Sequence, residues 1–233
     1  MTAKSRSARR REAREQRERQ QAARWLLPAA GALIAVVAIV AIVLSQSGSG
    51  GGGTASAGTS AGVSAPPVSV TAPQITGAAL PRLTDPANDA ATGMIAPTVA
   101  GHDYAGHAVS IEPTGKPMLV IFAAHWCPHC QREIPLIQQW INEGKAPADV
   151  DLRTVSTGVD PTLPNYPPEA WFQRVGWTPP VIADPTNSVA AAYGLPSYPF
   201  FVLLDGKGHV VQRFTGEIPM DQLSQILAAA PRS

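Results

Sequence analysis

Apolar and polar positions along the second half of the chain predict a succession of strands and helices. The run PMLVIFAA at 117–124 is so uniformly apolar that it predicts a strand buried on both faces. VDLRTVST at 150–157 predicts a second strand. Between them, PHCQREIPLIQQWINEG at 128–144 has isoleucines at helical spacing, and it predicts a helix that stops at Gly144.

The pattern continues to the end of the chain. NSVAAAYGL at 187–195 predicts a short helix, and MDQLSQILAAA at 220–230 predicts an amphipathic one. FFVLLD at 200–205 and HVVQRF at 209–214 are separated by Gly-Lys-Gly, which predicts an antiparallel hairpin. A strand–helix–strand unit followed by a hairpin and a helix predicts an α/β fold with a mixed central sheet flanked by helices.

A different apolar pattern lies near the start of the chain. Residues 25–44, WLLPAAGALIAVVAIVAIVL, hold no charge, and about twenty apolar residues span a hydrocarbon core of roughly 30 Å. A cleaved signal peptide is the alternative, but its apolar core usually has only about 7–15 residues. We therefore predict a retained transmembrane helix.

Charge sets the expected orientation of this helix. Residues 1–24 carry nine Lys and Arg against three Glu, whereas the rest of the chain has more acidic than basic residues. Such a tail could bind nucleic acid, but beside a membrane span it is typical of the cytoplasmic side. We expect a single-pass cell-membrane protein with a cytoplasmic N-terminus, no nucleic-acid partner, and everything after Leu44 outside the cytoplasm.

Residues 45–95 are rich in Ser, Gly, Ala, Thr and Pro and hold hardly any large apolar side chain. A segment of this composition cannot bury enough surface to offset its ordering entropy. The sequence therefore predicts a flexible linker over 45–95 and a globular domain over 96–233.

Both cysteines of the chain lie in HWCPHC at 125–130. A structural disulfide over so short a loop would gain little stability, because stabilisation grows with loop length. A zinc site usually needs a second pair of ligands, and the remaining histidines are scattered. A redox-active disulfide is the interpretation that the residues favour, in a compartment where disulfides persist.

The position of Cys127 supports this interpretation. It follows a buried strand and precedes a helix, whose N-terminus should stabilise the thiolate and lower its pKa. Pro128 suits the first helical position, where a missing N–H costs nothing. We expect Cys127 to be the exposed nucleophile and Cys130 the buried resolving thiol, in chemistry that needs neither a metal nor an organic cofactor.

These motifs resemble the thioredoxin superfamily, and more narrowly the membrane-anchored TlpA/ResA-like thiol-disulfide oxidoreductases of bacteria. GKPMLVIFAAHWCPHC at 115–130 is similar to the family's entry into its active-site helix, and Pro135 matches a proline that kinks this helix. ADPTNSVAAAYGLPSYPFFVLLDGKGHVVQRFTGE at 183–217 resembles the later motifs. The resemblance implies a thioredoxin-like fold, with Pro199 as a cis-proline beside the cysteines that offers backbone groups to a client peptide.

The neighbours of the cysteines have candidate roles. The resemblance implies that Trp126 and Tyr198 form a substrate rim, although Trp126 could also be core packing. His129 could stabilise the thiolate of Cys127 and so tune its redox potential, or be an ordinary exposed helix residue. His125 has no role that the resemblance assigns.

Glu133 lies where many relatives carry a Glu in CxxCxxE, and it could accept a proton from the resolving thiol. The alternative is an acidic residue that complements the helix dipole. Thioredoxin instead uses a buried Asp on the preceding strand, and Ile121 occupies that position here.

The segment 160–181 is rich in proline and aromatic residues. Loops of this kind can bind a partner over a rigid scaffold, and Tyr166, Trp171 and Trp177 could supply a docking area. Local packing is the more usual role of such side chains.

The sequence thus predicts an extracytoplasmic enzyme that exchanges disulfides with client proteins and is recycled by an unidentified redox partner, in the membrane or outside it. CPHC has the central dipeptide of the periplasmic oxidase DsbA, whereas Glu133 and the anchor resemble the reductants, so the direction of electron flow stays open. A thioredoxin-fold protein that holds clients without turnover is the alternative function.

Overall fold

The computed structural model of the protein describes residues 71–232. The predicted cytoplasmic tail at 1–24, the transmembrane helix at 25–44 and most of the predicted linker lie outside these residues. Among residues 71–232, none of the helices combines the length and the apolar character that crossing a membrane requires.

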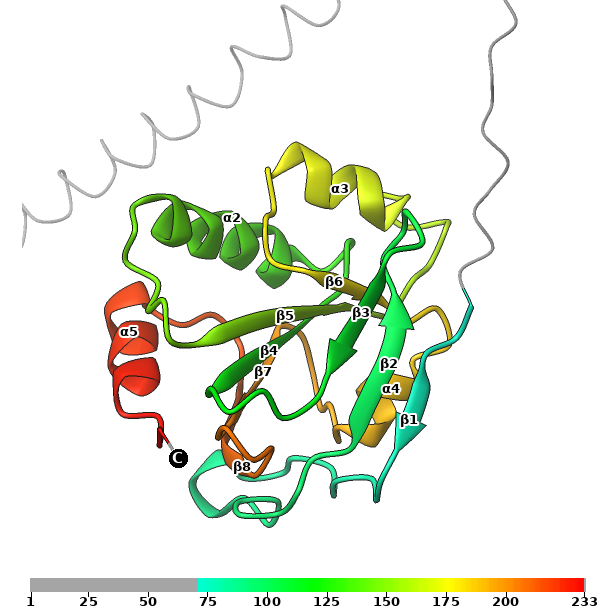
Figure 1. The fold of residues 1–233 in the computed structure, drawn as a ribbon. Helices are drawn as coiled ribbons and strands as arrows, with labels where there is room; N and C mark the ends of the chain where they lie inside the picture. Colours follow the sequence, from blue (N-terminus) through cyan, green and yellow to red (C-terminus); the bar gives the residue numbers. More distant parts are fainter. Residues whose placement is uncertain (1–70, 233) are drawn as a thin grey trace, which may run out of the picture. The chain divides into compact units, whose positions relative to one another are not determined.

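The central sheet has five strands in the order β6-β5-β4-β7-β8, and the β4–α2–β5 unit supplies its middle (Figure 1). Three strands run parallel, and β7 and β8 run antiparallel to their neighbours. The bounds are β4 Met118–Ala123, β5 Asp151–Ser156, β6 Val181–Ala183, β7 Phe200–Leu204 and β8 Val210–Thr215. The predicted mixed sheet and its hairpin are confirmed.

Both faces of β4 are buried, as its uniform apolar run predicts. Side chains of β4 alternate between two apolar clusters, with Phe122 in one and Ile121 in the other. The second cluster is covered by three helices: α2 Pro128–Asn142, α3 Pro168–Arg174 and α5 Met220–Ala228. Figure 1 shows α2 and α5 beside one another on this face.

The first cluster is covered by α4 Ser188–Ala192 and by a second sheet in the order β1-β2-β3. This three-stranded antiparallel sheet consists of β1 Gln74–Thr76, β2 Thr98–His102 and β3 Ala108–Ile111, and the sequence analysis did not predict it. The hydroxyl group of Tyr193, at the end of α4, donates a hydrogen bond to Pro97 O at 2.6 Å, which joins α4 to the residues before β2.

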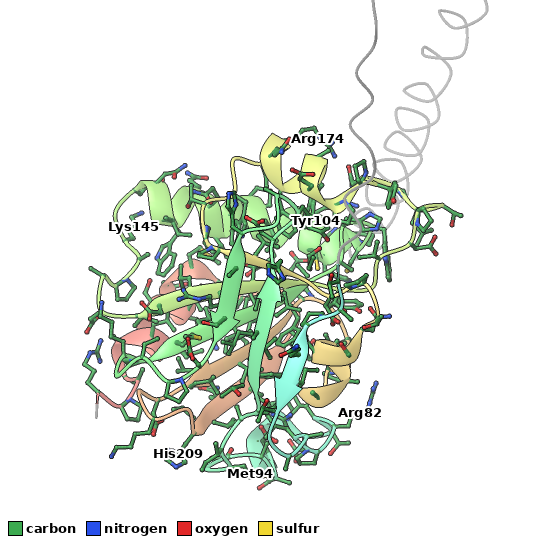
Figure 2. The ribbon with its side chains drawn as sticks, turned by 45° about the vertical axis from the view of Figure 1, so that its right-hand side comes forward. Arg82, Met94, Tyr104, Lys145, Arg174 and His209 are labelled. Atoms are coloured by element: carbon green, nitrogen blue, oxygen red, sulfur yellow. The ribbon has the colours of Figure 1, made fainter. Side chains whose placement is uncertain are left out.

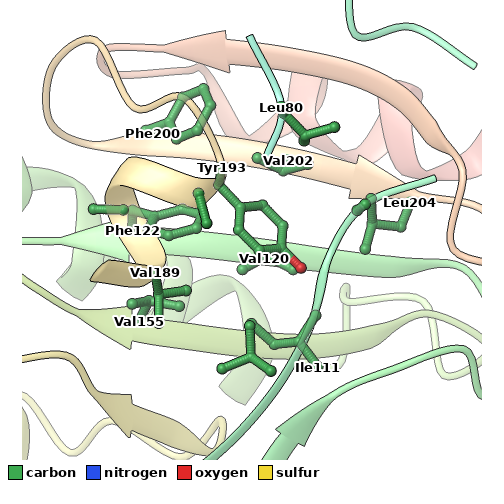
Figure 3. Close-up of a cluster of buried hydrophobic side chains, with 14 of the residues drawn as sticks. Leu80, Ile111, Val120, Phe122, Val155, Val189, Tyr193, Phe200, Val202 and Leu204 are labelled. Atoms are coloured by element: carbon green, nitrogen blue, oxygen red, sulfur yellow. The ribbon is translucent and has the colours of Figure 1, made fainter. Parts of the chain in front are cut away.

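The predicted start of the globular domain at residue 96 was wrong. Residues 71–95 contribute β1, the short 3-10 helix η1 Pro86–Asn88, and the buried side chains of Leu80 and Leu83. Figure 3 shows Leu80 among the side chains of the first cluster. These few apolar residues fold the segment because they pack into a cluster whose other members come from the rest of the domain.

A buried ion pair fixes the same segment. The guanidinium group of Arg213 on β8 is fully buried, and it donates hydrogen bonds to both carboxylate oxygens of Asp89, at 2.8 and 2.5 Å. It also donates to Pro81 O and Tyr193 O. On the surface, Arg82 donates to the two carbonyl groups that follow Gly194, on the side where α4 lies (Figure 2).

Candidate active site

The two thiols lie at the start of α2, shortly after the end of β4. Cys127 is the N-cap residue of α2, Pro128 occupies the first turn, and the two cysteines are free thiols in this structure. Cys127 is only 6% exposed and Cys130 is fully buried. The expected order of exposure is therefore kept, but the prediction of an exposed nucleophile was wrong, since neighbouring loops cover most of Cys127.

Burial also affects the second thiol. It raises the pKa of Cys130, because the protein interior solvates a thiolate poorly, and the nearby Cys127 and Glu133 act in the same direction. Cys130 can thus resolve a mixed disulfide only if a base accepts its proton or if the site opens.

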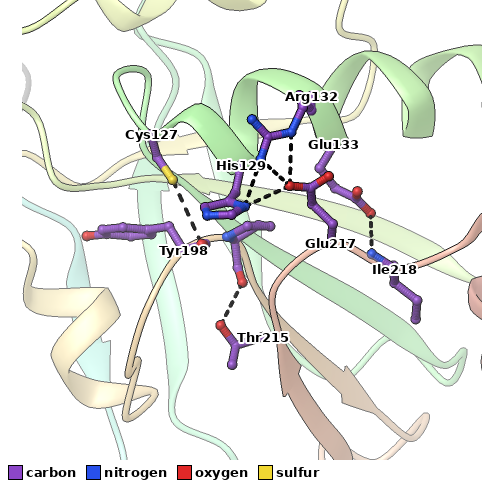
Figure 4. A network of polar contacts seen from close by, with 9 residues as sticks. Cys127, His129, Arg132, Glu133, Tyr198, Thr215, Glu217 and Ile218 are labelled. Carbon is purple, nitrogen blue, oxygen red and sulfur yellow. Dashed lines mark hydrogen bonds and ion pairs between the residues drawn. The ribbon is translucent and has the colours of Figure 1, made fainter. Parts of the chain in front are cut away.

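The loop before β7 faces the first thiol. The sulfur of Cys127 lies 3.8 Å from the carbonyl oxygen of Tyr198, to which its thiol donates a hydrogen bond (Figure 4). The Tyr198–Pro199 peptide bond is cis, as predicted. The carbonyl oxygen of Pro199 accepts hydrogen bonds from Gly216 N and from the Thr215 hydroxyl group, so β8 supports this loop.

Two aromatic residues meet beside the cysteines. The rings of Trp126 and Tyr198 lie edge to face with centroids 5.9 Å apart, and both residues are partly buried. The indole N–H of Trp126 donates to Gly158 O at 2.6 Å, and Asn187 Oδ1 accepts from Gly158 N. Gly158 has φ +63°, and a Cβ atom there would lie 2.7 Å from the Tyr198 hydroxyl oxygen. Gly158 therefore fixes the position of both aromatic side chains.

Glu133 is buried on the inner face of α2, one turn after Cys130. Burial raises the pKa of its carboxyl group to about 7, although the backbone N–H of Ile218 donates a hydrogen bond to it at 3.2 Å and lowers the pKa. The structure thus places Glu133 inside the protein, beyond the first turn of α2, rather than at the exposed helix N-terminus where it would complement the dipole. A carboxyl group with this pKa can accept or release a proton near neutral pH.

His129 lies on the outer side of the same helix and is more than half exposed. Its Nδ1 atom lies 2.7 Å from Glu217 Oε1, and Arg132 donates to the same oxygen from Nε and Nη2 (Figure 4). Hydrogen bonds from Arg132 and His129 lower the pKa of Glu217 to about 2, so its carboxylate is permanently charged. The prediction that His129 tunes the thiolate did not include this carboxylate.

The segment Gly216, Glu217 and Ile218 was not predicted from the sequence to belong to the site. Its three residues contact Pro199, His129 and Glu133 respectively. The only signal was the Thr-Gly-Glu that ends the family-like motif, and it gave no indication that this glutamate reaches α2.

The proline- and aromatic-rich segment 160–181 contains helix α3, which the sequence analysis described as a loop. Trp171 and Phe172 on this helix are buried, so local packing accounts for them, whereas Tyr166 is half exposed. The ring of His125 is fully buried and contacts the start of this segment. Its Nδ1 atom lies 2.7 Å from Pro164 O, and its Nε2 atom accepts a hydrogen bond from Asp160 N. Over residues 71–232, no three His, Cys, Asp or Glu side chains are grouped to hold a metal ion.

Comparison with known proteins gives matches to the same part of the chain. A family model described as Redoxin matches residues 86–229. Thiol-disulfide oxidoreductase ResA of Geobacillus kaustophilus is 28% identical over 138 residues, which cover 59% of this chain and 76% of that protein. Sporulation thiol-disulfide oxidoreductase A of Bacillus subtilis is 27% identical over 121 residues, covering 52% and 72%.

Among solved structures, a thiol:disulfide interchange protein of the thioredoxin family from Chlorobium tepidum is 25% identical, with a TM-score of 0.50. The match covers 61% of this chain and 99% of that one.

Proposed function

Since this chain belongs to the Redoxin family and its relatives include thiol-disulfide oxidoreductases of the ResA type, we propose that it exchanges disulfides with client proteins through Cys127 and Cys130. The family resemblance and the enzyme class predicted from the sequence are thereby confirmed. The client proteins, the roles of individual residues and the location in the cell belong to the proposal.

One observation carries the proposal: two free thiols lie at the start of α2, and the first of them, Cys127, donates to the carbonyl group of Tyr198. This carbonyl group can accept a hydrogen bond from an extended client backbone and hold the client's sulfur near Cys127. Trp126 and the Tyr198 ring form the wall beside that position.

The exchange runs in two steps. The Cys127 thiolate attacks one sulfur of the client disulfide, so a mixed disulfide forms and the other client sulfur leaves as a thiolate. Cys130 then loses its proton, with Glu133 as the acceptor, and attacks Cys127. The second client thiolate leaves, and the enzyme keeps the Cys127–Cys130 disulfide, having passed two electrons to the client. The reverse sequence oxidises a client dithiol.

Trapping tests this mechanism. In Cys130→Ser the second step is blocked, so we expect the full chain to accumulate mixed disulfides with client proteins, visible as higher bands on non-reducing gels. The double variant Cys127→Ser/Cys130→Ser is the control and should trap none. If Cys127→Ser retains turnover on a disulfide peptide, Cys127 is not the nucleophile and the proposal fails.

The direction of electron flow follows from the reduction potential. The reduction potential of the Cys127–Cys130 pair is measured by equilibration with glutathione. A potential near the roughly −120 mV of a strong oxidant would make disulfide formation the function, and one near roughly −270 mV would make it disulfide reduction.

For the location, we propose that residues 25–44 anchor the chain with residues 71–232 outside the cytoplasm. A reporter fused after Ser45 that stays cytoplasmic would contradict this.

A further inference from the structure

The side chains of His129, Arg132 and Glu217 join α2 to the segment after β8. Glu217 Oε1 accepts from Arg132 Nε at 3.0 Å and from Arg132 Nη2 at 2.5 Å, and it lies 2.7 Å from His129 Nδ1. Arg132 Nη2 also lies 2.9 Å from His129 Nδ1. Because the ionised carboxylate of Glu217 can only accept, the Nδ1–H of His129 donates to it, so His129 and Arg132 both donate to the same carboxylate oxygen.

These side chains lie near the nucleophile, Cys127. His129 is two residues after Cys127 on the first turn of α2, and Figure 4 shows the His129 ring between Cys127 and Glu217. Arg132 is charged at every working pH, and His129 can add a second positive charge. Both would stabilise a thiolate on Cys127, and Glu217 supplies the negative charge that opposes this effect.

We propose that Glu217 is a positioning residue that sets the reduction potential of the Cys127–Cys130 pair, because it orients and neutralises the two cations beside the nucleophile. The inference rests on the proposed function and deepens it. Glu217 makes no contact with a reacting sulfur, so it acts through His129 and Arg132.

The equilibrium with glutathione shows which way the potential moves. The reduced enzyme and one glutathione disulfide give the Cys127–Cys130 disulfide and two glutathione thiols, with two electrons passing to glutathione. Glu217→Gln removes one negative charge and leaves Arg132 uncompensated, so the reduced enzyme with its Cys127 thiolate becomes more stable. The variant is therefore the stronger oxidant.

The experiment compares the full-length wild type, Glu217→Gln and Glu143→Gln. Glu143 is the matched control, since it is an exposed glutamate at the far end of the same helix and pairs with Lys145 at 2.7 Å. At pH 8 we expect the equilibrium constant for oxidation by glutathione to fall roughly 3- to 30-fold in Glu217→Gln, because one negative charge is removed from this cluster; tenfold equals about 30 mV. Glu143→Gln should leave the equilibrium constant unchanged.

The pH dependence separates this role from a purely structural one. Glu217 stays ionised throughout, so the difference between wild type and variant should follow the ionisation of Cys127, read as the pH profile of its alkylation by iodoacetamide. The titratable groups that face Glu217 are Arg132, His129 and Glu133, so the profile is also recorded in an Arg132→Gln background. In that background the effect of Glu217→Gln on the reduction potential should shrink. In the otherwise wild-type chain, Glu217→Asp should keep most of the wild-type reduction potential, because it retains the carboxylate.

An equilibrium constant within twofold of wild type at both pH 6 and pH 8, or one that rises, would overturn the inference. So would an equal effect of Glu217→Gln with and without Arg132. A wild type that forms no disulfide with glutathione at all, although iodoacetamide alkylates Cys127, would instead overturn the proposed function, and this inference with it.

Discussion

At the scale of single residues, the candidate active site contains ionisable groups whose pKa values are raised by burial. Glu133 is a buried carboxyl group whose pKa burial raises to about 7, and Cys130 is a buried thiol whose pKa is raised as well. At neutral pH Cys130 therefore keeps its proton, whereas Glu133 is about half ionised and can accept that proton in the resolving step. The identities of Cys127, Cys130 and Glu133 could be predicted from CxxCxxE, but their depth in the protein could not, because it depends on distant loops that cover them.

The raised pKa of Glu133 predicts how stability changes with pH. The carboxyl group of Glu133 binds a proton more tightly in the folded state than in the unfolded state, where its pKa has the ordinary value of 4.5. The free energy of unfolding therefore falls as the pH rises from about 4.5 through about 7. The contribution is roughly 3 kcal/mol. Glu133→Gln should flatten this slope in urea unfolding of the reduced protein at pH 5, 6, 7 and 8. Glu112→Gln, an exposed control, should keep it, and equal slopes in wild type and Glu133→Gln would show that another group titrates.

Gly158 predicts a specific loss of activity. Gly158→Ala would place a Cβ atom 2.7 Å from the Tyr198 hydroxyl oxygen, and should displace the wall beside Cys127. We expect the rate of exchange with a disulfide peptide to fall tenfold or more, because small displacements of positioning groups are costly. Gly144→Ala is the matched control, since Gly144 has φ +67° but nothing within 4 Å of an added Cβ. If the two variants lose activity equally, backbone strain rather than contact with Tyr198 is the cause.

At the scale of elements, strongly apolar runs were predicted well and contacts between distant segments were not. β4, α2 and the β7–β8 hairpin follow from their own sequences. α3 was missed because the prolines before it mask a helix of only seven residues. Glu217 was missed because its partners on α2 lie 85 and 88 residues away in the sequence, where no local pattern can indicate them.

The ion pair between Arg213 and Asp89 predicts a large difference between two aspartates. Asp89→Asn removes the charge partner of a fully buried guanidinium group, and we expect it to lower the free energy of unfolding by about 3 kcal/mol. Asp149→Asn removes the partner of Arg232 in an exposed pair and should lower the free energy of unfolding much less, because water and salt screen that pair. Urea unfolding of both variants provides the comparison; similar losses would mean that the buried pair contributes no more than a surface one.

At the scale of the whole molecule, the domain begins earlier than its composition suggests. Leu80, Leu83 and Ala91 are isolated apolar residues in a segment rich in Pro, Ala and Thr, so no periodicity identifies them. Each gains its burial from the first apolar cluster, which is built by residues far along the chain. The sequence therefore predicted the body of the fold but placed this segment in the linker.

Truncation tests where the domain begins. A chain of residues 96–233 loses two buried leucines, worth roughly 1.5–3 kcal/mol each, and leaves Arg213 buried without its partner. These losses approach the about 5–15 kcal/mol that a whole domain has, so we expect this fragment to show no cooperative unfolding transition in urea. A chain of residues 71–233 should unfold cooperatively, and so should residues 78–233, which lack only β1. A stable 96–233 fragment would show that the segment is dispensable.

The attachment of residues 71–95 also has a mechanical consequence. A pull that arrives from the N-terminal side reaches β1 first, and β1 is a three-residue edge strand that can peel away from β2 one hydrogen bond at a time. The force then meets the contacts of Arg82 and, behind them, the buried pair of Asp89 with Arg213. β1 would thus detach while the buried contacts behind it still hold, so a pull on the N-terminal side would leave the sheet that supports Cys127 intact.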